Sequence, residues 1–157
     1  MDILNELERD HREVSGLFNR IQMTTERAAR SREDLFAQLM ITLESHAYAE
    51  ENVFYAALQD DPRTEQHVLE SIEEHGVMRT LLHKIETLPA HDEHWIAKIS
   101  VLAHWVGSHA TEEESAMFDR LRFLYSAAER ELMAERFLEL KADFIDGGNR
   151  RNRSQAI

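Results

Sequence analysis

The chain has 157 residues, of which 43% are hydrophobic and 31% are charged, as expected for a single globular domain. It contains no cysteine, which excludes disulfides, thiolate metal sites and thiol catalysis. The formal net charge of −12 disfavours binding to nucleic acid or to anionic membrane surfaces. With 5 glycines and 2 prolines, the chain has too few turn-forming residues for a β-sandwich or a barrel.

The sequence offers no targeting or membrane signal. No apolar run approaches the roughly 20 residues of a membrane span. The first ten residues lack the basic and then apolar pattern of a secretory signal peptide. We therefore expect a cytoplasmic location. The unusual feature of the composition is its nine histidines.

Apolar residues recur at spacings of three and four along most of the chain, which is the period of an α-helix. Five helices are predicted, over about residues 2–29, 31–59, 62–88, 92–124 and 126–146. Ser31 with Asp34 and Ser126 with Glu129 are typical of capped helix starts, and Pro62 is suited to a first helical position. Because the connections are short, we predict an all-α fold, an up-down-up-down four-helix bundle with an additional C-terminal helix.

The end of the chain differs in composition from the rest. Two glycines, Gly147 and Gly148, are followed by a polar segment with three arginines. Glycine commonly ends helices, and polar terminal segments are commonly disordered. We therefore divide the chain into a bundle domain, residues 1–146, and a disordered basic tail, residues 147–157.

Each of the first four predicted helices carries ionisable residues within its apolar stripe. A buried carboxylate without a partner costs several kcal/mol or takes up a proton. Two carboxylates beside four imidazoles inside one bundle therefore need a compensating charge, which a pair of metal ions supplies. The candidate metal ligands are His11, His46, Glu50, His75, His109 and Glu113.

The candidate ligands follow an internal repeat. His46 and Glu50 are four residues apart, as are His109 and Glu113, so each pair lies on one helix face and can reach one centre. The second predicted helix matches the fourth at an offset of 63 residues, and the first matches the third at an offset of 64. A helical hairpin used twice predicts two similar half-sites. Mixed imidazole and carboxylate ligands suit iron, manganese or zinc, whereas four imidazoles disfavour calcium and magnesium.

This order of ligands resembles the haemerythrin-like HHE cation-binding domain. The resemblance covers about residues 1–145. It rests on Asp10-His11, His46 to Glu51 with Val53-Phe54-Tyr55, Glu74-His75, and His109 to Glu114 with Met117-Phe118. It implies a four-helix bundle around two non-haem iron ions, bridged by the two glutamates and by an oxo or hydroxo group. Members of this family bind oxygen, respond to nitric oxide or iron, break down peroxide, or repair damaged iron centres.

The sequence departs from the oxygen carriers of this family in two places. The carriers have a second histidine four residues after the third-helix ligand, where this chain has Arg79. They have an aspartate five residues after the fourth-helix histidine, where this chain has Glu113 four residues on. By helical angle, neither His104 nor His83 is a simple replacement. Either an inward-facing Arg79 lies near an open metal position, or Arg79 reaches solvent and Tyr48 or Tyr55 closes that position.

Three functions remain open at this point. The first is redox chemistry on peroxide, oxygen or nitric oxide, which would make the protein a di-iron oxidoreductase. The second is reversible oxygen or nitric-oxide carriage or sensing, and the third is iron storage or repair. An open position on both irons favours reaction over transport. We expect a small-molecule ligand, no nucleic-acid or membrane partner, and a monomer or weak homodimer. Glu51 and the run Glu112–Glu114 are expected to be solvated.

Overall fold

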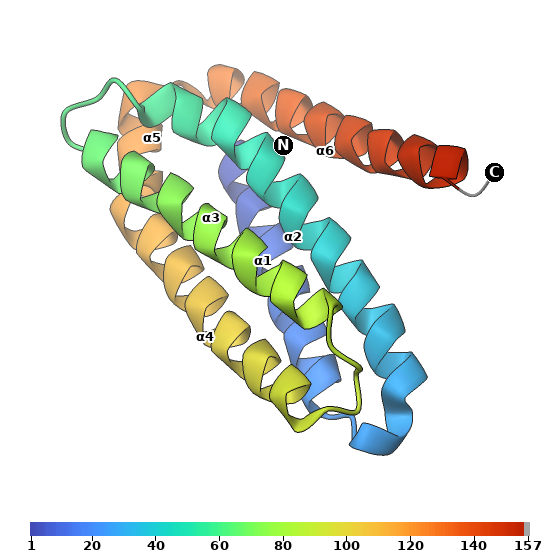
Figure 1. Cartoon of the computed structure of the whole chain (residues 1–157). Helices are drawn as coiled ribbons and strands as arrows, with labels where there is room; N and C mark the ends of the chain where they lie inside the picture. Colours follow the sequence, from blue (N-terminus) through green and yellow to red (C-terminus); the bar gives the residue numbers. More distant parts are fainter. Residues whose placement is uncertain (156–157) are drawn as a thin grey trace.

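The structure is a computed structural model that describes the backbone of residues 1–155 and the side chains of residues 1–148. Its elements are α1 (Ile3–Gln22), the 3₁₀ turn η1 (Glu26–Ala28), α2 (Ala29–Leu58), α3 (Glu65–Glu86), α4 (Glu93–Ala116), α5 (Phe118–Leu124) and α6 (Ala127–Gln155). Helices α1 to α4 run alternately up and down, and α1 and α3 each pack against both α2 and α4 (Figure 1). Within the described residues the fold is all-α, which confirms the predicted bundle. No helix in this part of the chain is long and apolar enough to cross a membrane.

Local side-chain chemistry explains several helix starts. The Asp92 carboxylate accepts a hydrogen bond from the backbone N–H of His94 and caps α4 close to its predicted start. Before α6, the Glu129 carboxylate accepts from the backbone N–H of Ser126, and the Ser126 hydroxyl accepts from the backbone N–H of Glu129. This is the reciprocal capping box predicted from the sequence.

Several predicted boundaries are wrong. The first helix, predicted to run to about residue 29, ends at Gln22. Helix α2 begins at Ala29, not at Ser31, because η1 leads directly into it. Helix α3 begins at Glu65, because Asp61 accepts backbone bonds from the residues that follow it and forms a turn first. The predicted fourth helix is interrupted at Met117, whose backbone departs from ideal helix geometry, so its last part is the separate helix α5.

Helix α6 is the additional C-terminal helix. It packs against α2 and α1 at an angle to the bundle, and its C-terminal end lies away from the other helices (Figure 1). The predicted helix stop at Gly147 and Gly148 is wrong, because α6 continues through both glycines without a positive φ. The division into residues 1–146 and a basic tail, 147–157, stays a prediction. Residues 156–157 of that tail lie outside the described residues.

Two separate apolar clusters fill the bundle. One lies between α1, α2, α5 and α6 and includes Phe54, Phe118 and Phe137. The other lies toward the opposite end of the bundle and includes Phe36 and Trp95. A layer of buried polar side chains from α1 to α4 separates the two clusters. A core divided in this way is costly unless its polar groups are paired.

Candidate metal centre

The six predicted ligands meet in this polar layer. Helices α1 and α3 each contribute one histidine, and α2 and α4 each contribute a histidine and a glutamate. One ligand atom from each of His11, His46 and Glu50 lies within 4.8 Å of the others, and the same holds for Glu50, His75 and His109. Glu50 thus belongs to both groups. Its Oε1 lies 3.4 Å from Nε2 of His46, and its Oε2 lies 3.3 Å from Nε2 of His75.

Glu113 spans the same two groups from the opposite helix. Its Oε2 lies 3.4 Å from Nε2 of His109, and its Oε1 lies 4.0 Å from Nε2 of His11. The centre therefore consists of two half-sites, each with two imidazoles, and both carboxylates extend across them. This arrangement matches the two half-sites that the repeat predicts.

Several buried atoms of the centre lack a hydrogen-bond partner among the described residues. They include both carboxylate oxygens of Glu50, Oε1 of Glu113 and Nε2 of His11. Glu50 is 0% exposed and Glu113 is 1% exposed, so water does not reach them from the surface. Buried polar atoms are nearly always satisfied in proteins. Unpartnered electron-pair donors that converge in one place fit the binding of metal cations.

Each histidine of the centre is held from behind by a carboxylate. In all four rings Nδ1 donates a hydrogen bond outward, so that Nε2 faces the centre. The pairs are His11 with Glu114 (2.7 Å), His46 with Asp10 (3.0 Å), His75 with Glu51 (2.8 Å) and His109 with Glu74. Such outer carboxylates fix the orientation of metal-binding imidazoles and raise their basicity.

The outer carboxylates follow the internal repeat. Asp10 and Glu74 each precede the lone histidine of a hairpin and bind the other histidine of that hairpin. Glu51 and Glu114 each follow a glutamate of the centre and bind the lone histidine of the other hairpin. The expectation that Glu51 and Glu114 are simply solvated is therefore wrong, whereas Glu112 is exposed as expected. The signal in the sequence was the acidic neighbour of each ligand, repeated in both hairpins.

Of the residues that could replace the missing fifth histidine, Tyr55 contacts the centre and Arg79 does not. The Tyr55 hydroxyl donates to Oε2 of Glu113 at 2.9 Å and lies 3.2 Å from Nε2 of His109. Arg79 instead donates to Glu51 at 2.9 Å, on the outer side of the centre. The inward-facing Arg79 is therefore ruled out in this structure. Tyr48, the other tyrosine considered, is exposed.

The two half-sites are not equivalent. The residue that the repeat pairs with Tyr55 is Phe118, 63 positions later, which has no hydroxyl. Tyr55 therefore has no counterpart in the half-site of His11 and His46. That half-site differs further in that Lys141 of α6 donates to Asp10, the carboxylate that holds His46.

When no metal is present, the electrostatics of the centre favour bound protons on His46, His109 and Glu113. Burial lowers the pKa of His46, but the charge of Glu50 and the bond to Asp10 outweigh it and raise this pKa to about 10. In the same way, the bond to Glu113 outweighs burial and raises the pKa of His109 to about 9. Burial and the charge of Glu50 raise the pKa of Glu113 to about 7. A metal must displace these protons, so its affinity depends on pH.

A small internal cavity adjoins the four histidines. Its volume is about 20 Å³, enough for one molecule of about the size of water. Apart from the histidines and Glu74, its walls are apolar: Val14, Leu43, Ala47, Met78, Trp105, Val106 and Ala110. Leu43 and Val106 precede His46 and His109 by one helical turn, and Val14 and Met78 follow His11 and His75 by one turn. The cavity therefore lies on the side of the histidines away from Glu50, Glu113 and Tyr55.

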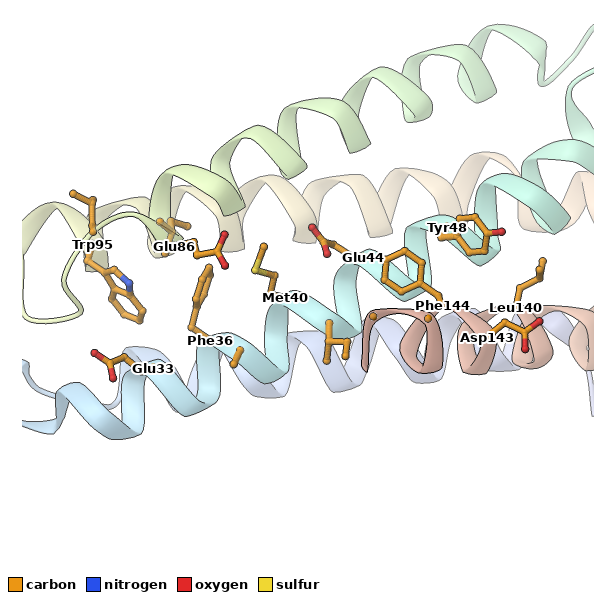
Figure 2. A pocket seen from close by; sticks show the side chains of 16 residues that line it. Glu33, Phe36, Met40, Glu44, Tyr48, Glu86, Trp95, Leu140, Asp143 and Phe144 are labelled. Atoms are coloured by element: carbon orange, nitrogen blue, oxygen red, sulfur yellow. The ribbon is translucent and has the colours of Figure 1, made fainter. Parts of the chain in front are cut away.

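A much larger groove, of about 970 Å³, lies between α2 and the C-terminal half of α6. Figure 2 shows Phe36, Met40 and Phe144 inside this groove, with Glu44 and Asp143 among its labelled residues. None of the residues that line it is a predicted ligand. The groove is therefore separate from the metal centre. The other histidines of the chain (His67, His83, His91, His94 and His104) are exposed.

Comparison with known families agrees with this geometry. The family model "Hemerythrin HHE cation binding domain" matches residues 2–121, which include every residue of α1 to α4. The chain belongs to this haemerythrin family. The match ends before α6, so Lys141 lies outside the segment that defines the family.

A curated relative of this haemerythrin domain is named "DNA nickase" and comes from Nostoc sp. (strain PCC 7120 / SAG 25.82 / UTEX 2576). The two are 28% identical over 142 residues, which is 90% of this chain and 40% of the relative. The chain therefore spans less than half of the length of that protein. No solved structure was found to match the chain.

Proposed function

We propose that this haemerythrin domain binds two iron ions, one in each half-site, with Glu50 and Glu113 as shared ligands. The observation that carries the proposal is that each of these two fully buried carboxylates presents one oxygen to each half-site. Without metal, the charge of these carboxylates is offset by protons, because the pKa values of His46 and His109 are raised to about 10 and about 9. Two divalent cations would replace these protons as the counter-charge and satisfy the unpartnered oxygens.

The ligand types are compatible with iron. Nε2 atoms of His11 and His46 would bind one ion, and those of His75 and His109 the other. Nitrogen and oxygen donors without thiolate suit iron, manganese and zinc, so the donor set alone leaves three metals. The family resemblance favours iron among them. The outer carboxylate on every ring is typical of imidazoles that bind transition metals.

Tyr55 would add a further ligand to the half-site of His75 and His109. Its hydroxyl oxygen lies 3.2 Å from one Nε2 and 3.5 Å from the other. Burial and the charges of the two central glutamates raise the pKa of Tyr55 well above its ordinary value. A bound cation reverses this effect and favours the phenolate. The half-site of His11 and His46 has no such group, so it retains an open position.

The function that this arrangement supports best is reaction with a small oxidant, such as peroxide, oxygen or nitric oxide, at the open half-site. The irons would supply the electrons for this chemistry. The apolar walls of the inner cavity, Val14, Met78 and Val106 among them, exclude bulk water and restrict access to molecules of a few atoms. A phenolate oxygen from Tyr55 would stabilise ferric iron, which disfavours the return to ferrous iron that reversible oxygen release requires.

Reversible carriage or sensing is the second candidate. The number of open metal positions favours it. With Tyr55 as a ligand, only one half-site would keep an open position, and an oxygen carrier likewise saturates one of its two irons. Iron storage or repair is the third candidate. We do not propose DNA nicking for this chain on the basis of the Nostoc relative's name, because the net charge of −12 opposes approach to a phosphate backbone. A cytoplasmic location and a monomer or weak homodimer stay predictions.

The reduced, iron-loaded protein separates these candidates when it is mixed with oxygen, hydrogen peroxide or nitric oxide. For an oxidoreductase we expect many equivalents of peroxide to be consumed per centre, and no oxygen adduct that reverses when oxygen is removed. A stable adduct that reverses under argon would identify a carrier. A matched variant, His109→Ala, should lose both activities if they arise at this centre.

A further inference from the structure

A groove of about 160 Å³ opens on the surface between α1 and α4, directly outside the metal centre. Its outer part is formed by exposed residues that include Ser15, Asn19 and Gly107. Its inner wall is shared with the cavity of about 20 Å³ beside the histidines. The side chains that line both spaces are His11, Val14, Val106 and Ala110. A single layer of side chains thus separates the surface groove from the inner cavity.

The walls of this groove are uncharged. None of the described residues that line it is Asp, Glu, Lys or Arg, although these types make up 31% of the chain. A charged molecule would lose hydration there without gaining a partner, whereas a neutral molecule has a small desolvation free energy. A second opening, between α3 and α4, is lined by Glu70, Glu74 and Glu112 and has the opposite chemistry. The two openings therefore differ in the charge of what they would admit.

Val106 and Gly107 of α4 line the groove, where a change in side-chain size would alter its width. Gly107 lies inside α4, where glycine costs roughly 1 kcal/mol of helix stability relative to alanine. A Cβ atom built at Gly107 meets no atom within 4 Å, so a larger side chain would extend into free space. Val106 is half-buried and belongs to the layer between the two spaces. Rotation of one such side chain takes picoseconds to nanoseconds at exposed positions.

We propose that the groove between α1 and α4 is the route by which an uncharged small molecule reaches the half-site of His11 and His46, with Val106 as its inner gate. His11 lines both spaces, and its Nε2 is one of the unpartnered atoms of the centre. The route thus leads to the half-site that lacks a counterpart of Tyr55. The proposal rests on the proposed function, because it assigns the access route of that same centre.

The test measures how fast nitric oxide binds to the anaerobic iron(II)-loaded protein in a stopped-flow instrument. Gly107→Leu fills the groove and should lower the association rate constant about tenfold, equivalent to about 1.4 kcal/mol added to the barrier. Val106→Ala thins the inner layer and should raise the rate constant. Iron content and the final spectrum should match those of the parent protein in both variants.

Gly16→Leu is the matched control. Gly16 is an exposed glycine of α1 where a Cβ atom also meets no atom within 4 Å, and it does not line the groove. Its rate constant should equal that of the parent. An unchanged rate constant in Gly107→Leu would overturn the proposal and would favour entry through the opening between α3 and α4.

A measurement without iron distinguishes failure of the route from failure of the proposed function. Met78 is 5% exposed and lines the inner cavity. In the zinc-loaded protein, dissolved oxygen should accelerate the nuclear relaxation of the Met78 methyl group, because oxygen is paramagnetic. Absence of this effect would refute the route even if the iron centre reacts. Its presence, together with an iron-loaded protein that does not bind nitric oxide, would refute the function and leave the route standing.

Discussion

Replacing Glu113 by glutamine should stabilise the metal-free protein and destabilise the iron-loaded protein. In the metal-free fold, burial and the charge of Glu50 raise the pKa of Glu113 from 4.5 to about 7. While this carboxyl group is protonated, its burial does not lower the free energy of unfolding, and the destabilisation develops as pH rises from 4.5 through 7. At pH 8 it amounts to about 3 kcal/mol, at about 1.4 kcal/mol per pKa unit. Glutamine removes this charge and can still accept the hydrogen bond from Tyr55.

The same substitution removes a shared anionic ligand from the iron-loaded protein. Iron affinity should fall by more than the roughly 10–100-fold that changes in outer residues cause. The assay is urea-induced unfolding at pH 8 of the chelator-treated and iron(II)-loaded proteins, with iron content measured in parallel. Glu112→Gln, an exposed neighbour on α4, is the matched control and should change neither form. If Glu113→Gln lowered the stability of both forms, Glu113 would be a structural residue and the reasoning would be refuted.

Three further predictions concern pH, Tyr55 and α6. The pKa of His46 is raised from 6.5 to about 10, so the stability that its proton gives the metal-free protein is complete below pH 6.5 and is lost by about pH 10. Metal affinity rises over the same interval, because fewer protons compete with the metal. The melting temperatures of the metal-free and iron-loaded proteins, measured by calorimetry, should therefore diverge as pH rises, and parallel curves would contradict this. Tyr55→Phe should remove a visible phenolate-to-iron absorption band from the ferric protein, and an unaltered spectrum would show that Tyr55 is not a ligand. Lys141→Met should weaken iron binding about tenfold by freeing Asp10, which holds His46, whereas Lys141→Arg should retain it in a competition titration.

The sequence was sufficient to predict the bundle and the residues that converge in it, because helical periodicity places His46 and Glu50 on one inward face. The same periodicity could not place the outer carboxylates. Glu51 lies next to Glu50 on the helix, so its side chain points toward the rim of the bundle, and only the packing of α2 against α3 brings it to His75. The acidic neighbours repeated in both hairpins were informative, but they look the same as solvated charges in a single helix.

Tyr55 and Arg79 show a second limit of sequence reasoning. Spacing identified the position of the missing histidine as Arg79, but it gave no information on how far a long side chain reaches. In the fold, Arg79 pairs with Glu51, and Tyr55 from α2 contacts the centre instead. The helix that continues through Gly147 was missed for a different reason, since glycine is common after helix ends but also tolerates a right-handed helical backbone.

The most direct test of the dinuclear centre is anomalous X-ray scattering at the iron edge from crystals of the iron-loaded protein. We predict two iron peaks per chain, roughly 3.5 Å apart as in other two-metal sites, both between Glu50 and Glu113. The variant His46→Ala should lose both peaks together, because the carboxylates are shared. A single peak, or two peaks that do not both lie against these carboxylates, would contradict the proposed centre.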